Sequence, residues 1–243
     1  MNFLDHLMEL RKRLIHTLWG VLLGFLIAYH YSRQIYEFLM RPLCRTFEDP
    51  ICPIIYMSVA EPFMVYVKVG IISGIFLAAP WIFFQLWKFV SPGLHTHEKK
   101  WVIPFVGIAS MMFVGGSLLG YFYIFPLAFE FFLKEAARPI RPMLGMNNYF
   151  SFATTMLLAF GVLFEIPVLV VLLNLIGLVQ AKTLWRTWRF GVAGIFILAA
   201  IITPADPYSM LLFGIPLSIL YLGSLAICSL IEGARENTRE KTI

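Results

Sequence analysis

The stretch AFGVLFEIPVLVVLL, Ala159–Leu173, decides what kind of protein this sequence encodes. It is apolar throughout except for Glu165, and it lies inside a longer apolar run from Tyr149 to Leu178. About twenty apolar residues in a helix are enough to cross the hydrocarbon core of a bilayer. The run is therefore predicted to be a transmembrane helix that carries one carboxyl group near its middle.

The composition of the whole chain fits a membrane protein. Of its 243 residues, 60% are hydrophobic and only 14% are charged, whereas soluble domains average roughly 45–50% apolar and about 25% charged. A single soluble core of this length cannot bury so much apolar surface. The net charge of +5 is spread over short segments between apolar stretches, so nucleic acid is not predicted as a partner. No small-residue cleavage site follows the first apolar stretch, so no cleavable signal peptide is expected.

Six apolar stretches predict an all-α polytopic membrane protein, with one integral membrane domain over residues 1–243. The third stretch is long enough to tilt. The fifth has only 13 continuously apolar residues, which reach roughly 20 Å as a helix, so either it needs the preceding LWRTW to cross or the bilayer thins beside it. Prolines inside the spans predict kinked helices of unequal length, and hence a curved, open wall. The predicted spans are residues 14–31, 63–87, 101–132, 149–178, 190–202 and 208–231, and the prolines are Pro80, Pro104, Pro126, Pro167 and Pro216.

The distribution of lysine and arginine predicts the orientation. With six spans the two termini share one side of the membrane, and that side carries twelve basic residues against six on the other. An excess of basic residues marks the cytoplasmic side, so both termini are expected to be cytoplasmic. The larger set is Arg11, Lys12, Arg13, Lys88, Lys99, Lys100, Lys182, Arg186, Arg189, Arg235, Arg239 and Lys241; the smaller is Arg33, Arg41, Arg45, Lys134, Arg138 and Arg141.

Two longer segments lie on the side opposite the termini, here called the trans side. Ser32–Pro62 contains RQIYEFLMRPLCRTF, whose apolar residues recur at helical spacing, so an interfacial helix is expected there. Leu133–Asn148 contains two prolines and a glycine, which predict a loop with at most a short helix. Cys44 and Cys52 lie eight residues apart in the first segment. This spacing leaves open both a disulfide, if the trans side is oxidising, and two unpaired cysteines.

Few polar residues suggest chemistry. The sequence has no Ser-His-Asp set, zinc-protease motif, Walker motif or dinucleotide-binding glycine motif, so no enzyme, metal site or cofactor is predicted. Glu9 and Arg13 have the i,i+4 spacing of a helical ion pair. In the loop FVSPGLHTHEKKW, Glu98 either presents a carboxylate to a cationic ligand or belongs to an ordinary short loop. Gln85 and Asn174 are predicted to form hydrogen bonds between helices.

These features together resemble the TatC family, the core subunit of the twin-arginine protein translocase. The resemblance rests on HLMELRKRL, SVAEPFMVYVK, FFQLWKFVSPGLHTHEKK, FPLAFEFF, FGVLFEIPV and TPADPYSM, which are collinear with the family and cover nearly the whole chain. It implies a receptor in the bacterial cytoplasmic membrane that binds twin-arginine signal peptides of folded cargo. It also implies recruitment of single-span TatA/TatB-type subunits and export driven by the proton-motive force, without nucleotide hydrolysis. Self-association is left open.

The resemblance further implies roles for individual residues. Two guanidinium groups in a signal peptide suit carboxylates, which bind them through charge-assisted and often bidentate hydrogen bonds. An aromatic ring can pack on the peptide or stack on a guanidinium. Glu61 stands where the family commonly has a small residue, so no role is implied for it. The implied positions are Phe89, Glu98, Glu9 and Arg11 for signal-peptide binding, Glu165 for an intramembrane polar site, and Pro42 and Asp206 on the trans side.

Glu165 also supports a different interpretation. A charge at the middle of a span costs about 2.5–3.5 kcal/mol on insertion scales, so such residues usually serve a function. In a receptor, Glu165 and the short fifth span are expected to offer a docking groove to a partner helix. The alternative is a small ion-coupled transporter that uses Glu165 as its ion site, although no internal repeat and no second membrane acid support it. A subunit of a respiratory complex lacks a paired-histidine haem pattern, and a membrane enzyme lacks a nucleophile–base set.

Overall fold

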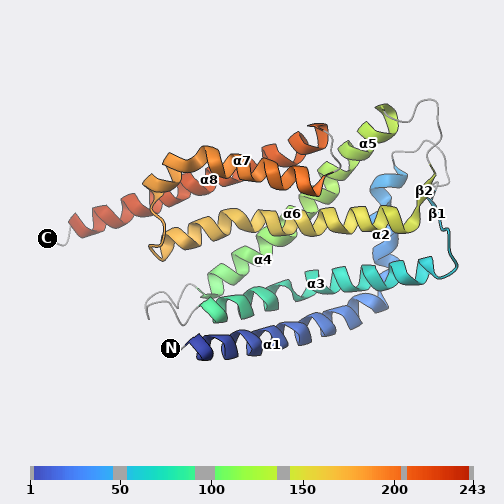
Figure 1. Cartoon of the computed structure of the whole chain (residues 1–243), viewed down its shortest axis with the longest axis horizontal. Helices are drawn as coiled ribbons and strands as arrows, with labels where there is room; N and C mark the ends of the chain where they lie inside the picture. Colours follow the sequence, from blue (N-terminus) through green and yellow to red (C-terminus); the bar gives the residue numbers. More distant parts are fainter. Residues whose placement is uncertain (1–2, 46–53, 91–101, 136–142, 204–206, 241–243) are drawn as a thin grey trace. The chain divides into compact units, whose positions relative to one another are not determined.

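A computed structural model of the chain describes residues 3–45, 54–90, 102–135, 143–203 and 207–240 (Figure 1). The chain divides into two compact units, Met1–Phe160 and Gly161–Ile243, which are described separately. The boundary falls within α6, so each unit contains one half of that helix. The elements are α1 (Phe3–His30), α2 (Ser32–Cys44), β1 (Ile54–Ile55), α3 (Glu61–Val90), α4 (Val102–Leu119), the π-helix η3 (Gly120–Ile124), α5 (Phe125–Glu135), β2 (Leu144–Gly145), α6 (Met146–Leu175), α7 (Ala181–Ile202) and α8 (Pro207–Glu240).

Among the described residues, six helical segments are long and apolar enough to cross a membrane, which confirms the predicted six-span, all-α architecture. The first begins well before residue 14, because HLMELRKRL continues the helix. The fourth ends at Leu175 and not at residue 178, because Gly177 has φ of 75°, a conformation that ends helices. The fifth includes LWRTW, as expected. The six segments are Leu4–His30, Glu61–Phe89, Ile103–Phe132, Met146–Leu175, Ala181–Ile202 and Pro207–Ala234.

The first unit is organised by a close contact between α1 and α3, which lie side by side (Figure 1). A Cβ built on Gly24 would lie 2.5 Å from the carbonyl oxygen of Gly74, and one built on Gly74 would lie 2.6 Å from the backbone nitrogen of Phe25. Each glycine ends a GxxxG motif, at residues 20–24 and 70–74. Small residues at this spacing let membrane helices touch backbone to backbone. The contact fixes the register of the two helices.

At the trans side, a helix forms where one was expected, as α2. The short strands β1 and β2 were not predicted. They pair in parallel, Ile54 with Leu144 and Ile55 with Gly145. Strands of two residues are too short to leave a periodic pattern in the sequence.

The prolines in the spans do not all interrupt helices. Pro80, Pro167 and Pro216 lie inside α3, α6 and α8 as predicted. Pro104, by contrast, is the third residue of α4, where a backbone N–H has no partner within the helix. The prediction that Pro104 interrupts a helix is therefore wrong. Pro126 is the second residue of α5, in the first turn after the wider turn of η3.

In the second unit, α7 packs on α8 (Figure 1). Glycines that face aromatic rings make this contact. A Cβ on Gly191 would overlap the Tyr221 hydroxyl, and one on Gly214 would overlap the Phe196 ring. The apolar part of α7 and the middle of α8 are thus in direct contact. Gly191 of α7 makes room for the Tyr221 ring of α8, and Gly214 of α8 makes room for the Phe196 ring of α7.

Candidate functional site

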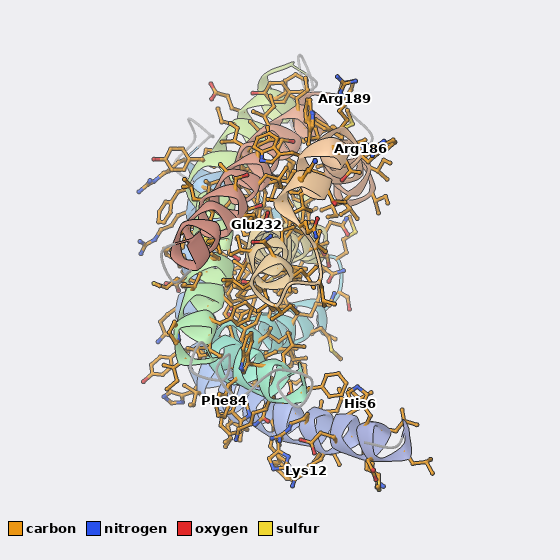
Figure 2. All side chains as sticks on the ribbon, turned by 90° about the vertical axis from the view of Figure 1, so that its left-hand side faces the viewer. His6, Lys12, Phe84, Arg186, Arg189 and Glu232 are labelled. Atoms are coloured by element: carbon orange, nitrogen blue, oxygen red, sulfur yellow. The ribbon has the colours of Figure 1, made fainter. Side chains whose placement is uncertain are left out.

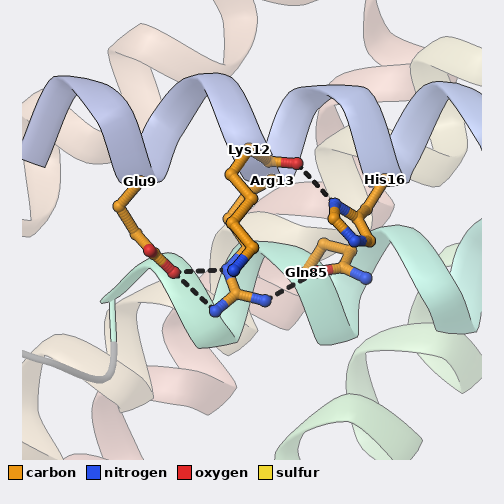
Figure 3. A network of polar contacts seen from close by, with 5 residues as sticks. All are labelled: Glu9, Lys12, Arg13, His16 and Gln85. Carbon is orange, nitrogen blue, oxygen red and sulfur yellow. Dashed lines mark hydrogen bonds and ion pairs between the residues drawn. The ribbon is translucent and has the colours of Figure 1, made fainter.

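The start of α1 and the end of α3 form a polar cluster, here called the α1–α3 end, which consists of His6, Glu9, Arg13, Gln85 and Phe89. Nε of Arg13 donates to Oε1 of Glu9 at 2.7 Å, and Nη2 lies 2.5 Å from the same oxygen (Figure 3). Nη1 of Arg13 donates across the helix pair to Oε1 of Gln85 at 3.2 Å. The predicted ion pair of Glu9 and Arg13 is therefore present, and it is tied to α3.

Gln85 anchors this network from the inside. Its side chain is only 2% exposed, whereas Glu9 and Arg13 retain 23% and 21% of their side-chain exposure. Farther along the pair, Nε1 of Trp81 donates to the carbonyl oxygen of His16 at 2.9 Å. The expectation that Gln85 forms a hydrogen bond between helices is confirmed. These contacts hold the partly exposed carboxylate of Glu9 against the paired helices α1 and α3.

Phe89 reaches the same cluster from the last turn of α3. Its ring stacks on that of His6, with centroids 4.5 Å apart and an interplanar angle of 29°. His6 lies one helical turn before Glu9. The fold thereby brings together Phe89 and Glu9, two of the predicted signal-peptide residues, from widely separated parts of the sequence. Glu98, a third, lies outside the described residues.

Arg11 is not part of this network. It is exposed, and positions two apart on a helix point about 200° away from each other, so its side chain leaves α1 on a different side from Glu9. His6, Arg13 and Gln85 were not predicted as site residues. The sequence signal for Arg13 was its i,i+4 spacing from Glu9, and the signal for Gln85 was an amide inside a predicted span. Nothing in the sequence indicated that His6 stacks on Phe89.

Pro42 has a specific structural effect on the trans side. It lies inside α2 and has no N–H to donate to the carbonyl oxygen of Phe38, four residues earlier. The hydroxyl of Tyr121 donates to this oxygen instead, at 2.5 Å. The hydroxyl of Tyr149 donates to the next carbonyl, that of Leu39, at 2.6 Å. Two tyrosines from η3 and α6 thus hold α2 in place.

Glu61 joins three parts of the trans side. Its Oε2 accepts from the backbone N–H of Met57 at 2.7 Å, and its Oε1 accepts from that of Asn147 at 2.8 Å. Asn147 lies in the first turn of α6, where N–H groups lack helical partners and carboxylates are favourable. Nζ of Lys68 donates to Oδ1 of the same Asn147 at 2.6 Å. The residue to which the resemblance gave no role therefore caps a helix.

Glu165 lies in the part of α6 that belongs to the second unit, two residues before Pro167. Its side chain is 8% exposed. Its role as a polar site for a partner helix stays a prediction. Asp206, the predicted trans-side aspartate, lies outside the described residues.

A polar cluster in the second unit was not predicted as a whole. Oε1 of Glu232, near the end of α8, accepts from the backbone N–H of Ala181 at 2.8 Å and from Nδ2 of Asn174 at 2.6 Å. Nδ2 of Asn174 also donates to the carbonyl oxygen of Val179 at 2.9 Å. Ala181 is the first residue of α7. The carboxylate of Glu232 therefore caps α7 and joins it to the ends of α6 and α8, and Asn174 forms the interhelical hydrogen bond expected of it.

The cysteines that the structure describes differ in their bonding. Cys44 is in a disulfide, and Cys52, its predicted partner, lies outside the described residues. Cys228 is a buried free thiol. Within the described ranges, no group of three or more His, Cys, Asp or Glu residues is arranged to hold a metal ion.

Comparison with known proteins agrees with the resemblance. The family model described as "Sec-independent protein translocase protein (TatC)" matches residues 5–216. The protein of this name from Koribacter versatilis (strain Ellin345) is 34% identical over 244 residues, which cover 99% of this chain and 90% of the relative. That from Desulforapulum autotrophicum is 37% identical over 239 residues, with 98% and 88% covered.

A solved structure is similar over nearly its whole length. The crystal structure of the twin-arginine translocase receptor TatC superposes with a TM-score of 0.81 and 32% sequence identity, and the match covers 93% of this chain and 98% of the other. The family model matches most of the chain, the relatives align over nearly its full length, and the described residues form six spans. The chain therefore belongs to the TatC family of Sec-independent protein translocase proteins.

Proposed function

We propose that this protein is the core receptor subunit of a twin-arginine translocation system in a bacterial cytoplasmic membrane. It binds the twin-arginine signal peptide of folded cargo at the α1–α3 end and recruits single-span TatA/TatB-type subunits for export driven by the proton-motive force. Membership of the TatC family supports the translocase role. The likeness to a solved twin-arginine translocase receptor supports the receptor role.

One observation carries the assignment of the binding surface: the stack of Phe89 on His6 beside the Glu9–Arg13 pair. It provides an aromatic ring and a partly exposed carboxylate at one end of a helix pair. A guanidinium binds such a carboxylate through charge-assisted hydrogen bonds, and apolar side chains of the signal peptide pack on the ring. Glu98 adds a second carboxylate for the second arginine, and Arg11 contacts the peptide from another side of α1.

The α1–α3 end faces the cytoplasm in this proposal. The excess of basic residues on the side of the termini supports this orientation. The disulfide at Cys44 supports it independently, because α2 then lies on the trans side and disulfides persist in oxidising compartments. Pro42 and Asp206 act on that side, Pro42 by freeing the Phe38 carbonyl for Tyr121.

Glu165 serves the partner subunits. A buried carboxyl group in a span offers a strong hydrogen-bond partner to a polar residue on an incoming helix. We place docking of a single-span subunit near Glu165 and the short apolar part of α7.

Photocrosslinking tests the binding surface directly. A photoreactive phenylalanine analogue replaces Phe89 in the full-length protein in membranes, and the exposed Phe122 is the control position. Crosslinks to a twin-arginine signal peptide are expected from position 89 and not from position 122, and they are expected to disappear when both arginines become lysines. Equal crosslinking of the Arg-Arg and Lys-Lys peptides would contradict the proposal.

The Glu9→Gln variant tests the carboxylate. It keeps the size and the hydrogen-bonding oxygen of the side chain but removes the charge, so crosslinking to the twin-arginine peptide is expected to fall while the protein inserts normally. Unchanged crosslinking in this variant would exclude Glu9 from the site.

A further inference from the structure

Three basic residues form an exposed stripe at the start of α7, here called the α7 stripe: Lys182, Arg186 and Arg189. All three are exposed. Spacings of four and three residues place them within about 60° of one another around the helix. The labelled side chains of Arg186 and Arg189 project away from the ribbons, whereas Glu232 lies among them (Figure 2).

The charges of the α7 stripe have no counter-charge in the described part of the chain. The stripe residues take no part in the ion pairs of Arg13 with Glu9 and of Arg33 with Glu37. Two carboxylates are described in the second unit. Glu165 lies in the interior of α6, and Glu232 is engaged by Ala181 and Asn174. Like charges at i,i+4 destabilise a helix, so anions bound beside the stripe would stabilise α7.

Two indoles flank the stripe and indicate where such anions lie. Trp185 is 43% exposed and donates from Nε1 to the Ser229 hydroxyl on α8 at 2.8 Å. The Arg189 guanidinium lies 5.7 Å from the ring centroid of Trp188, within the range of a cation–π contact. Tryptophan is enriched at the level of lipid headgroups. Immediately after the stripe, Phe190 begins the apolar part of the helix.

We propose that the α7 stripe binds the phosphate groups of anionic phospholipids, such as phosphatidylglycerol or cardiolipin, in the leaflet at the start of α7. The lysine and two arginines supply the charge, and the indoles hold the stripe at headgroup depth. Basic residues next to the membrane attract anionic headgroups in this way. The α7 stripe lies in the second unit, whereas the proposed signal-peptide surface lies in the first.

Native mass spectrometry of the full-length protein in a mild detergent tests the proposal, with phosphatidylglycerol, cardiolipin or phosphatidylcholine added. The unmodified protein is expected to retain the two anionic lipids and not phosphatidylcholine. Each Gln substitution in the α7 stripe is expected to weaken retention by about fivefold. The matched control is the triple change Arg33→Gln, Arg41→Gln and Arg45→Gln on α2 and its C-cap, which removes the same charge and is expected to keep the lipid.

Three results would overturn the proposal. One is unchanged retention in the variant with all three stripe residues changed to Gln. The second is equal loss in the α2 control. The third is loss in the charge-conserving variant Lys182→Arg, Arg186→Lys and Arg189→Lys, which keeps all three cations. Protection against thermal unfolding by inorganic phosphate, equal to that by the lipids, would assign the stripe to a free anion instead.

Discussion

Arg13 contacts Glu9 through two guanidinium nitrogens that converge on a single carboxylate oxygen, Oε1. The guanidinium also donates to buried Gln85 on the neighbouring helix, so the Glu9 side chain is fixed relative to both helices. Its second oxygen, Oε2, accepts no hydrogen bond from Arg13. In the proposed receptor, this oxygen is the one that a signal-peptide arginine approaches.

Arg13→Gln is expected to weaken binding of the twin-arginine peptide, although it removes a positive charge from the vicinity of a cationic ligand. The loss of orientation of Glu9 outweighs the relieved repulsion, and we expect about a tenfold increase in Kd, measured with purified protein in nanodiscs. Lys12→Gln is the matched control, because it removes the same charge one residue away. Tighter binding by Arg13→Gln would show that Arg13 competes with the ligand. In a Glu9→Gln background, Arg13→Gln is expected to have no further effect.

Phe89→Ala is expected to reduce crosslinking to the signal peptide strongly, whereas Phe89→Tyr keeps the ring and most of the crosslinking. The reason is that the stack on His6 orients the ring at the end of the helix pair. Phe84→Ala, one and a half turns earlier on α3, serves as the control for general packing loss. If Phe84→Ala and Phe89→Ala reduce crosslinking equally, the ring of Phe89 has no specific role.

Glu165→Gln is expected to retain most of the copurification of a single-span partner subunit, and Glu165→Ala is expected to lose it. A neutral amide can still donate and accept hydrogen bonds with a polar residue on the partner helix, whereas a methyl group cannot. Quantitative pull-down from detergent-solubilised membranes measures both. Equal loss in the two variants would point instead to the charge or to proton transfer.

Gly24→Ala is expected to destabilise the first unit by about 1–3 kcal/mol, because the added Cβ meets the backbone of Gly74 and the helices must separate. Unfolding by a denaturing detergent, followed by tryptophan fluorescence, measures the change. Gly107→Ala is the control, since a Cβ there has no atom within 4 Å. Comparable stability of the two variants would mean that the glycine contact is not needed.

Tyr121→Phe is expected to cost about 1–3 kcal/mol of unfolding free energy, because it leaves the Phe38 carbonyl without its donor. Pro42→Ala supplies a backbone N–H that can take over this carbonyl within α2. In the Pro42→Ala background, Tyr121→Phe is therefore expected to lower the unfolding free energy by only a small fraction of what it costs in the unmodified protein. If both backgrounds give the same cost, the proline and the tyrosine are not coupled.

The sequence predicts those structural features that depend only on one segment of the chain and on the thickness of the bilayer. Six apolar runs give six spans, and i,i+4 spacing gives the Glu9–Arg13 pair. The register between helices is harder to predict, because it depends on contacts between distant segments. The stack of Phe89 on His6 follows only once Gly24 is opposite Gly74, and the two GxxxG motifs that set this register were a signal that the prediction did not use.

Other features had no usable signal. The hydrogen bond from Tyr121 to Phe38 depends on a proline in one segment and a hydroxyl in another. Glu61 resembles an ordinary surface acid until Asn147 is beside it. The two-residue strands are too short for any periodicity. The predicted kink at Pro104 is wrong because the helix begins two residues before the proline.

The cap that Glu232 places on α7 also has a consequence for biosynthesis. The carboxylate lies 51 residues downstream of Ala181, so α7 is synthesised before the residue that caps it. The cap on α7 therefore forms only after residue 232 has been added to the chain. A message truncated before codon 232 would yield a product in which the first turn of α7 lacks this cap.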